Sequence, residues 1–257
     1  MTEKIRIVGI SSSPRHANTE VMLKEALKAA EETYPEVQTE FYCLKAKLIK
    51  PCCDCKACER RTAESLADQC IQRDDWSKTI RPLVDPVPNG IILASPVYFS
   101  DINAQMRAFM ERCTSLVKPF WFSDLPFSAP DFSRTAAGGI AVGFHRHGGQ
   151  ETAILSILKF CAIMGMAVVG SVDPDHGPIG YYGGGGWEDV TGSPSRESVK
   201  NDAWGLFSAR VLGRKVARTA LMLAKAPEVL PFSETFVSPM ESYSERIPAA
   251  GDDSYAR

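Results

Sequence analysis

Residues 5–19 read IRIVGISSSPRHANT, and they contain the unit on which the fold depends. The run Ile5–Ile10, apolar except for Arg6, is typical of a strand that is buried on both faces of a parallel sheet. A loop rich in hydroxyl groups follows, and apolar residues then recur at helical spacing from Val21 to Ala30. The segment therefore predicts a strand, a polar loop and a helix, which is the first half of a βαβ unit.

The same alternation of apolar runs and helical spacing continues along the chain. Further strands are predicted at Val37–Leu44, Gly90–Ser95, Ala136–Gly143 and Met166–Val172. Further helices are predicted at 76–84, 102–113, 150–164 and 200–224. Because helices separate the strands, the pattern indicates an α/β protein with a flavodoxin-like, doubly wound, five-stranded parallel sheet and helices on both faces.

Composition supports one domain followed by a tail. Residues 1–226 are expected to form the domain, and 227–257 a C-terminal tail without periodicity. Within the domain we expect a cysteine-rich loop at 51–75, after the second strand, and long loops at 119–133 and 174–198. The formal net charge of −2 gives no electrostatic attraction for nucleic acid or an anionic membrane. No apolar run reaches the ~18 residues of a membrane span and no signal peptide is recognisable, so a cytoplasmic location is expected.

Polar side chains gather directly after the first strand, where an open α/β sheet binds its ligands. Hydroxyls, an amide, a guanidinium and the free N–H groups of a helix start converge there, which predicts a phosphate site. The candidate residues are Ser11, Ser13, Arg15, Asn18 and Thr19. Helix capping alone is the alternative, and it leaves Arg15 unexplained. The glycine-rich fingerprints of dinucleotide and P-loop nucleotide sites are absent from this position.

Two more strand exits carry residues suited to a planar ligand. After the third strand, stiff and flat apolar groups could border a ring, and the candidates are Pro96, Val97, Tyr98, Phe99 and Ser100. After the fourth, glycines allow close approach of the backbone, and side-chain nitrogens could contact a ring edge. The candidates there are Gly143, His145, Arg146, Gly148 and Gly149, although a solvated loop face would explain the histidines equally well.

These three stretches resemble the NADPH-dependent FMN reductase superfamily. The similar motifs are Gly9–Thr19, Ser95–Arg112 and Gly148–Glu151, in that order, and the resemblance extends over residues 5–225. Ser12 stands where the family often has glycine. The resemblance implies that FMN binds at the three strand exits, with its phosphate on the first loop and its ring between the second and third. It also implies NAD(P)H as co-substrate and a homodimer or homotetramer.

Six of the eight cysteines lie between positions 43 and 70, a clustering that suggests metal or redox chemistry. Within the superfamily, this run resembles that of the iron–sulfur flavoproteins, which implies a [4Fe-4S] cluster on Cys52, Cys55, Cys58 and Cys70. Eleven residues separate Cys58 from Cys70, against about five in the family pattern. Zinc and free, redox-active thiols stay open as alternatives. Cys43 and Cys53 are expected to be spectators, and Cys113 and Cys161 buried small hydrophobes.

The sequence thus predicts an FMN-dependent oxidoreductase. Electrons would come from NAD(P)H or a ferredoxin and pass to a small-molecule acceptor such as a quinone, a flavin or an aromatic compound. No side chain is expected to act as a catalytic nucleophile. A non-catalytic electron carrier and a thiol or metal sensor are the competing hypotheses. Residues 120–122 and 229–237 are apolar enough to be candidate contacts between subunits.

Overall fold

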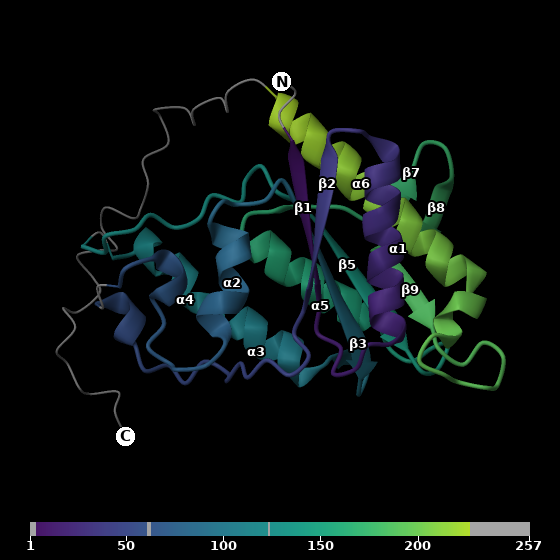
Figure 1. Ribbon diagram of the computed structural model, residues 1–257, viewed down its shortest axis with the longest axis horizontal. Coiled ribbons are helices and arrows are strands. Elements are labelled where there is room, and N and C mark those ends of the chain that lie inside the picture. The colour runs from purple at the N-terminus through teal and green to yellow at the C-terminus, as the bar shows by residue number, and fades with distance from the viewer. Residues whose placement is uncertain (1–3, 61–62, 123, 227–257) are drawn as a thin grey trace. The chain divides into compact units, whose positions relative to one another are not determined.

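Parallel strands form the central sheet of the computed structural model, which describes residues 4–60, 63–122 and 124–226 (Figure 1). The strand order is β2-β1-β3-β5-β6. Its long strands are β1 (Ile5–Ser11), β2 (Val37–Cys43), β3 (Gly90–Tyr98) and β5 (Ala136–Gly143). They are all parallel to their neighbours, so every exit loop lies at the same edge of the sheet. The flavodoxin-like, doubly wound fold predicted from the sequence is confirmed.

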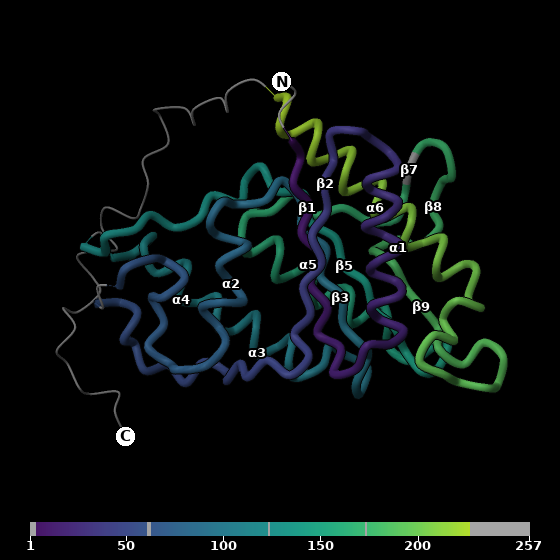
Figure 2. Tube along the Cα trace, in the orientation of Figure 1, coloured from purple at the N-terminus to yellow at the C-terminus, as the bar shows by residue number. Residues whose placement is uncertain are grey.

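Helices cover both faces of the sheet, as the ribbon and the Cα trace both show (Figures 1 and 2). On one face lie α1 (Asn18–Thr33) and α6 (Ala203–Lys225). On the other lie α2 (Trp76–Val84), α3 (Ala104–Arg112) and α5 (Gln150–Ile163). Residues of β3 alternate between the two cores, with Ile91 and Leu93 facing one and Ile92 facing the other. This alternation explains the continuous apolar run, because neither strand face meets water.

The fifth position of the sheet is shared by two segments, and the prediction of a single strand over Met166–Val172 is too long. Only β6 (Ala167–Val168) pairs there with the first half of β5. The chain then leaves the sheet and forms the antiparallel pair β7 (Ser171–Asp173) and β8 (Gly177–Gly180). It returns as β9 (Gly184–Trp187), which pairs in parallel with β5 from Ile140 to Gly143.

Close backbone contacts explain why this divided strand escaped prediction. The run Gly183–Gly186 suggests a loop, because glycine is rare in strands. In the structure, a Cβ at Gly184 would lie only 3.1 Å from the Cα of Ala209 in α6. A Cβ at Gly170, where the chain diverges from β5, would lie 2.2 Å from the carbonyl oxygen of Tyr181. Glycine is therefore required at these points by space, and the strand forms despite its propensity.

Short elements complete the fold between the long ones. They are β4 (Asp101–Ile102), α4 (Thr114–Val117), η1 (Ala57–Glu59), η2 (Leu66–Asp68), η3 (Lys118–Phe120) and η4 (Ser198–Asn201). The last helix thus begins at Ala203 and not at Lys200. The reason is that Asp202 accepts hydrogen bonds from the N–H groups of Gly205 and Trp187, at 3.0 and 2.8 Å, which starts α6 and anchors the end of β9.

The compact unit that contains the sheet ends at Lys225. None of the helices within the described ranges is both long and apolar enough to cross a membrane. Phe120 and Trp121 are exposed, so they are free to meet a partner as the sequence suggests. The other candidate contact, at 229–237, lies outside the described residues. Oligomerisation therefore stays a prediction.

Candidate functional site

The loop between β1 and α1 is folded around two buried hydroxyl groups. Ser11 Oγ accepts a hydrogen bond from the N–H of Ser13 at 3.3 Å. Ser13 Oγ in turn accepts from the N–H of Arg15 at 3.2 Å and donates to its carbonyl oxygen at 2.6 Å. These bonds hold the loop in a tight turn at the carboxyl end of β1.

The first turn of α1 offers unpaired donors beside this loop. Ala17 occupies the N-cap position and has no side chain that could cap the helix. Among the described residues, no protein acceptor faces the backbone N–H groups of Ala17, Asn18 and Thr19. Free N–H groups and the positive end of the helix dipole favour an anion. The geometry fits the phosphate site predicted from the sequence.

Asn18 contacts protein and not open space. Its Nδ2 donates to the carbonyl oxygen of Ser195 at 2.8 Å, and its Oδ1 accepts from the N–H of Val199 at 3.0 Å. The side chain therefore holds a distant segment against the first loop. A direct contact between this amide and a phosphate would require these bonds to break, so its role as a phosphate ligand stays a prediction. Thr19 is buried in the same turn.

A cavity of about 420 Å³ opens beside the first loop, within the size range of ligand sites. Its walls come from the first three exit loops and from the segment before η4. The lining residues are Arg15, Pro96, Val97, Tyr98, Val142, Phe144, Glu188, Pro194, Ser195 and Arg196. The structure thus brings together four of the predicted residues, from two different loops, around one space.

The second exit loop is a tight hairpin. β3 continues to Tyr98 and turns back into β4, with Phe99 and Ser100 at the tip at φ values of 48° and 63°. Both residues of such a two-residue turn are left-handed, a conformation that costs a residue other than glycine about 1 kcal/mol. Tyr98 lines the cavity, whereas the Phe99 side chain is fully exposed. Contact of Phe99 and Ser100 with a flavin therefore stays a prediction.

The third loop is docked onto that hairpin through a glycine. Gly149 has a φ of 102°, and a Cβ at this position would lie 2.4 Å from the Cα of Ser100. Gln150 closes the loop, since its Nε2 donates to the carbonyl oxygen of His145 at 2.6 Å and its Oε1 accepts from the N–H of Gly148 at 2.9 Å. A side chain at Gly143 would collide with this amide, at 2.5 Å from Nε2. The glycines thus shape the loop, while His145 is exposed.

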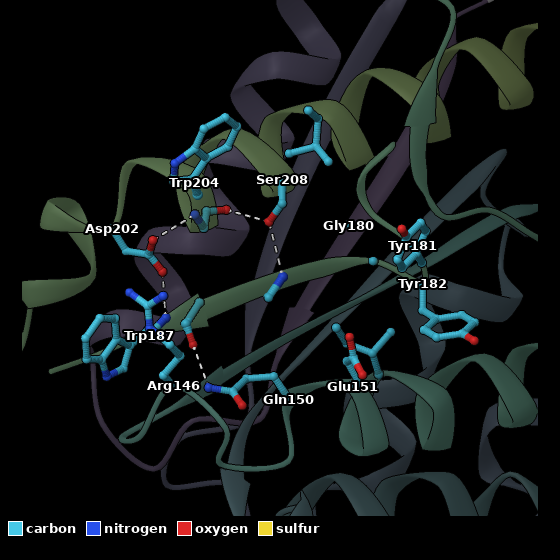
Figure 3. Close-up of a pocket in the computed structure, with 16 residues that line it drawn as sticks. Arg146, Gln150, Glu151, Gly180, Tyr181, Tyr182, Trp187, Asp202, Trp204 and Ser208 are labelled. Atoms are coloured by element: carbon cyan, nitrogen blue, oxygen red, sulfur yellow. Dashed lines mark hydrogen bonds between the residues drawn. The ribbon is translucent and has the colours of Figure 1, made fainter. Parts of the chain in front are cut away.

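Arg146 points to a different cavity, of about 350 Å³ (Figure 3). Its guanidinium lies over the ring of Trp187, 4.5 Å from the centroid. The same cavity is lined by Glu151, Tyr182 and Trp204. Phe144, on the same loop, lines the first cavity instead. The sequence-based assignment of Arg146 to the flavin gains no support from this placement and stays a prediction.

Six residues of the first cavity were not singled out from the sequence. They are Val142, Phe144, Glu188, Pro194, Ser195 and Arg196. The last lies in a stretch that was interpreted only as a long loop, yet Ser193-Pro-Ser-Arg196 resembles the Ser12-Ser-Pro-Arg15 of the first loop. That similarity is a signal that could have found it. With Arg15 and Arg196, the cavity has two guanidinium groups near its mouth.

The predicted cysteine ligands come together on the opposite face of the sheet from α1. Cys52, Cys55, Cys58 and Cys70 line one narrow cavity, which we call the cysteine cup, and Cys53 also reaches it. The long interval before Cys70 does not separate it from the others. Gln69 Nε2 donates to the carbonyl oxygen of Cys58 at 2.9 Å and so holds the two ends of the interval together.

Two cations face the cysteine cup, and each is paired with a carboxylate. Arg112 is 1% exposed and donates to Asp74, whose side chain is 0% exposed, at 2.6 Å. Lys118 contacts Glu59 at 2.7 Å. Nε of Arg112 has no hydrogen-bond partner among the described residues, which leaves a buried donor beside the cup. Burial raises the pKa of the Cys58 thiol to about 11, and Lys118 opposes that rise.

This donor set fits a metal group. Four thiols within one cup provide the ligands of either an iron–sulfur cluster or a zinc ion, and nearby cations stabilise the thiolate form. Cys113 and Cys161 are buried in the core, as predicted. Cys43 lies elsewhere, and its Sγ donates to Glu20 at 3.0 Å.

Comparison with known proteins identifies the family. The sequence profile of NADPH-dependent FMN reductases matches residues 5–174. The chain belongs to the NADPH-dependent FMN reductase family. It is therefore an FMN-binding oxidoreductase of flavodoxin-like fold, as its sequence predicts.

Relatives within the family are similar over nearly the whole length. An iron-sulfur flavoprotein of Methanocaldococcus jannaschii is 35% identical over 222 residues, which are 86% of this chain and 100% of the relative. An iron-sulfur flavoprotein of Archaeoglobus fulgidus is 36% identical over 220 residues, covering 85% and 97% of the two chains. The structure of RosB with a bound riboflavin-phosphate intermediate aligns with a TM-score of 0.55 over 94% of this chain and 86% of that one. At 14% identity, this last likeness concerns the fold alone.

The buried pair of Arg112 and Asp74 yields a prediction about stability. The substitution Asp74→Asn leaves a buried guanidinium without its counter-charge, so we expect the free energy of unfolding to fall by about 3–5 kcal/mol. Urea unfolding at pH 7 measures the change. As a control, Glu197→Gln removes an exposed ion pair with Lys200 and should change stability by less than about 0.5 kcal/mol.

The same pair should make stability depend on pH. Burial acts to raise the pKa of Asp74, but hydrogen bonds from Arg112 and from the N–H groups of Lys50 and Trp76 outweigh it and hold the pKa below its ordinary value. A depressed folded-state pKa gives stability that is present above the unfolded value of about 3.9 and is lost as the pH falls further. The wild type should therefore lose more stability than Asp74→Asn between pH 5 and pH 3. Equal losses would contradict this account.

Proposed function

We propose that this FMN-dependent oxidoreductase holds a [4Fe-4S] cluster in the cysteine cup and uses NAD(P)H as its hydride donor. One observation carries the proposal: a single compact unit contains both an anion-binding loop beside a 420 Å³ cavity and a cup of four cysteines. The relatives named as iron-sulfur flavoproteins support the same pairing of cofactors. We infer a small-molecule acceptor, such as a quinone, a free flavin or an aromatic compound, with a ferredoxin as the alternative electron donor.

The first loop would hold the FMN phosphate. Its N–H groups, the Ser11 hydroxyl and the guanidinium of Arg15 would donate to one anion, while the Ser13 hydroxyl, which donates to the carbonyl oxygen of Arg15, would shape the loop around it. Arg196 adds a second positive charge from the segment that Asn18 holds in place. These groups would fix the cofactor through its charged end, which leaves the ring free to contact the other two loops.

The second and third loops would border the ring. Pro96 and Tyr98 provide one wall, and Val142 and Phe144 provide apolar surface on another. Flavin bound there supplies the redox chemistry, while the protein sets its position, its electrostatic surroundings and the access of partners. The apolar walls would exclude water from the ring.

The cysteine cup would hold the cluster through Cys52, Cys55, Cys58 and Cys70. Each ligating thiol loses its proton. For Cys58, whose pKa is raised by burial, the bond to iron would have to offset the cost of this deprotonation. The guanidinium of Arg112 and the ammonium of Lys118 border the same cup. They would stabilise the thiolates and the negative charge of a cluster.

Turnover with a nicotinamide separates this proposal from a non-catalytic electron carrier. Purified, FMN-loaded protein should oxidise NADH or NADPH in the presence of a soluble quinone, with steady-state turnover well above the rate of the free flavin control. Stopped-flow flavin bleaching should show direct reduction by the nicotinamide. If a reduced ferredoxin reduces the flavin and neither NADH nor NADPH does, the protein is a non-catalytic electron carrier instead.

Substitutions in the phosphate loop test the flavin site. Arg15→Ala and Arg196→Ala each remove a charge-assisted contact, so FMN affinity should fall by ~1.5–3 kcal/mol, roughly tenfold to a hundredfold. Fluorescence titration of the apoprotein with FMN measures the affinity. Arg146→Ala is the matched control, because its guanidinium lies at the other cavity and its loss should change affinity little. A larger loss of FMN affinity in Arg146→Ala than in the other two variants would place the flavin in the second cavity instead.

Substitutions in the cup test the cluster ligands. In anaerobically purified protein, replacing any of Cys52, Cys55, Cys58 and Cys70 by serine should sharply lower the content of iron and acid-labile sulfide. Cys53→Ser is the matched control and should keep both. FMN should remain bound in all five variants, because its phosphate loop is separate from the cup. Zinc in place of iron, or an air-formed disulfide without metal, would support the two alternative uses of these thiols.

A further inference from the structure

A third group of ligand-type side chains lies behind the phosphate loop. His16 precedes α1, Glu20 lies in its first turn, and Cys43 ends the neighbouring strand β2, opposite Ser11. His16 Nδ1 is 3.0 and 3.1 Å from the two carboxylate oxygens of Glu20. Cys43 Sγ lies 3.0 Å from Oε1 of the same carboxylate. One ligand atom from each residue falls within 4.8 Å of both others.

Burial and charge make this group unusual for a simple surface ion pair. The Glu20 side chain is only 4% exposed, yet the cation nearest to it, Lys24, is 3.7 Å away on a side chain that is 59% exposed. The Cys43 thiol points at the buried carboxylate, and burial together with this contact raises its pKa to about 11. A buried carboxylate next to a thiol gains most from a partner that can neutralise both groups at once.

The three side chains match the coordination chemistry of zinc. Imidazole nitrogen, carboxylate oxygen and thiolate sulfur are all zinc ligands, at about 2.0–2.3 Å from the ion. Ligand atoms at such distances are roughly 3.2–3.8 Å apart in a tetrahedron, so the present contacts need only small side-chain rotations. The His16 side chain is 61% exposed, so solvent leaves room for it to rotate. A borderline ion such as Zn²⁺ suits this mixed set better than Mg²⁺ or Ca²⁺, which prefer oxygen.

Space for a fourth ligand lies on the solvent side. A cavity of about 260 Å³ is lined by His16, Glu20 and Lys24, and also by Glu25 and Glu197. A water molecule or a small anion could reach an ion from there. Three protein ligands with one open position are typical of accessible zinc sites, whereas closed structural sites use four.

We propose that His16, Glu20 and Cys43 form a zinc site with its fourth position open to this cavity. The site is separate from the cysteine cup, and it needs neither the flavin nor a cluster. Binding replaces the thiol proton, which passes to the buffer. Because the ligands come from the first loop, α1 and β2, a bound ion would fasten that loop to the neighbouring strand.

The test first removes the four predicted cluster ligands of the cup, which leaves Cys53 as its one thiol. In a variant with Cys52, Cys55, Cys58 and Cys70 replaced by serine, calorimetric titration with zinc chloride should give one ion per chain. The enthalpy should change with the ionisation enthalpy of the buffer, because a proton is released. Adding His16→Ala or Cys43→Ser to this variant should weaken binding by at least about tenfold. His147→Ala, an exposed histidine on the third loop, is the matched control and should bind as before.

Cobalt provides a direct readout of the thiolate ligand. Co²⁺ added to the four-serine variant should produce a sulfur-to-cobalt charge-transfer band that Cys43→Ser abolishes. If the four-serine variant does not fold, the wild-type chain and its Cys43→Ser variant can be compared after zinc loading and dialysis, where the proposal expects a difference of one ion per chain. Equal zinc content, or zinc binding that survives the loss of either His16 or Cys43, would overturn the site in favour of a simple ion pair with a thiol hydrogen bond.

Discussion

One buried amide, that of Asn103, joins two of the loops that line the 420 Å³ cavity. Its Nδ2 donates to the carbonyl oxygen of Ser12 at 2.8 Å, and its Oδ1 accepts from the Ser12 hydroxyl at the same distance. The N–H of Asn103 donates to Ser95 Oγ at 3.1 Å, and Oδ1 also accepts from the N–H of Met106 at 3.1 Å, which caps α3. The first loop, the end of β3 and the start of α3 therefore share one side chain. The Ser12 hydroxyl is therefore part of the junction.

Hydrogen bonds from buried amides position two walls of the cavity, and a close backbone contact positions a third. Unpaired buried polar groups are costly, so a network that satisfies all its members holds a single arrangement. Asn18 fixes the segment before η4 by two hydrogen bonds, just as Asn103 fixes the second loop. Gly149 fixes the third loop by the absence of a side chain, since its backbone lies against Ser100. Segments more than 180 residues apart in sequence thus meet at one cavity, and these contacts hold its walls in place.

The parts of this arrangement that follow local sequence rules could be predicted, and the parts that follow from distant contacts could not. Periodicity located the strands and their exits, and the fold then placed Arg15 and Tyr98 at one edge. No local rule indicates that β9 is a strand, because its glycines answer to distant neighbours: Gly184 lies against α6, and Gly186 lies against Val199 and Met22. Nor does any local rule separate Phe144 from Arg146, which lie two residues apart and line different cavities. Arg196 reaches the first cavity only because Asn18 holds its segment there.

The ion pairs beside the cysteine cup show how contacts between residues distant in sequence affect the acidity of the thiols. Arg112 follows apolar helix positions in the sequence, and hydropathy gives no reason to bury it. In the structure, Asp74 neutralises Arg112, and Glu59 neutralises Lys118, so the cup carries two neutral pairs and not two bare cations. An unpaired guanidinium beside the thiols would lower their pKa values and make them reactive in the empty protein. Pairing limits this effect, and burial outweighs the attraction of Lys118 and raises the pKa of the Cys58 thiol to about 11. A contact between residues 38 positions apart, Arg112 and Asp74, thus decides the charge beside the thiols, and no local pattern in the sequence reveals it.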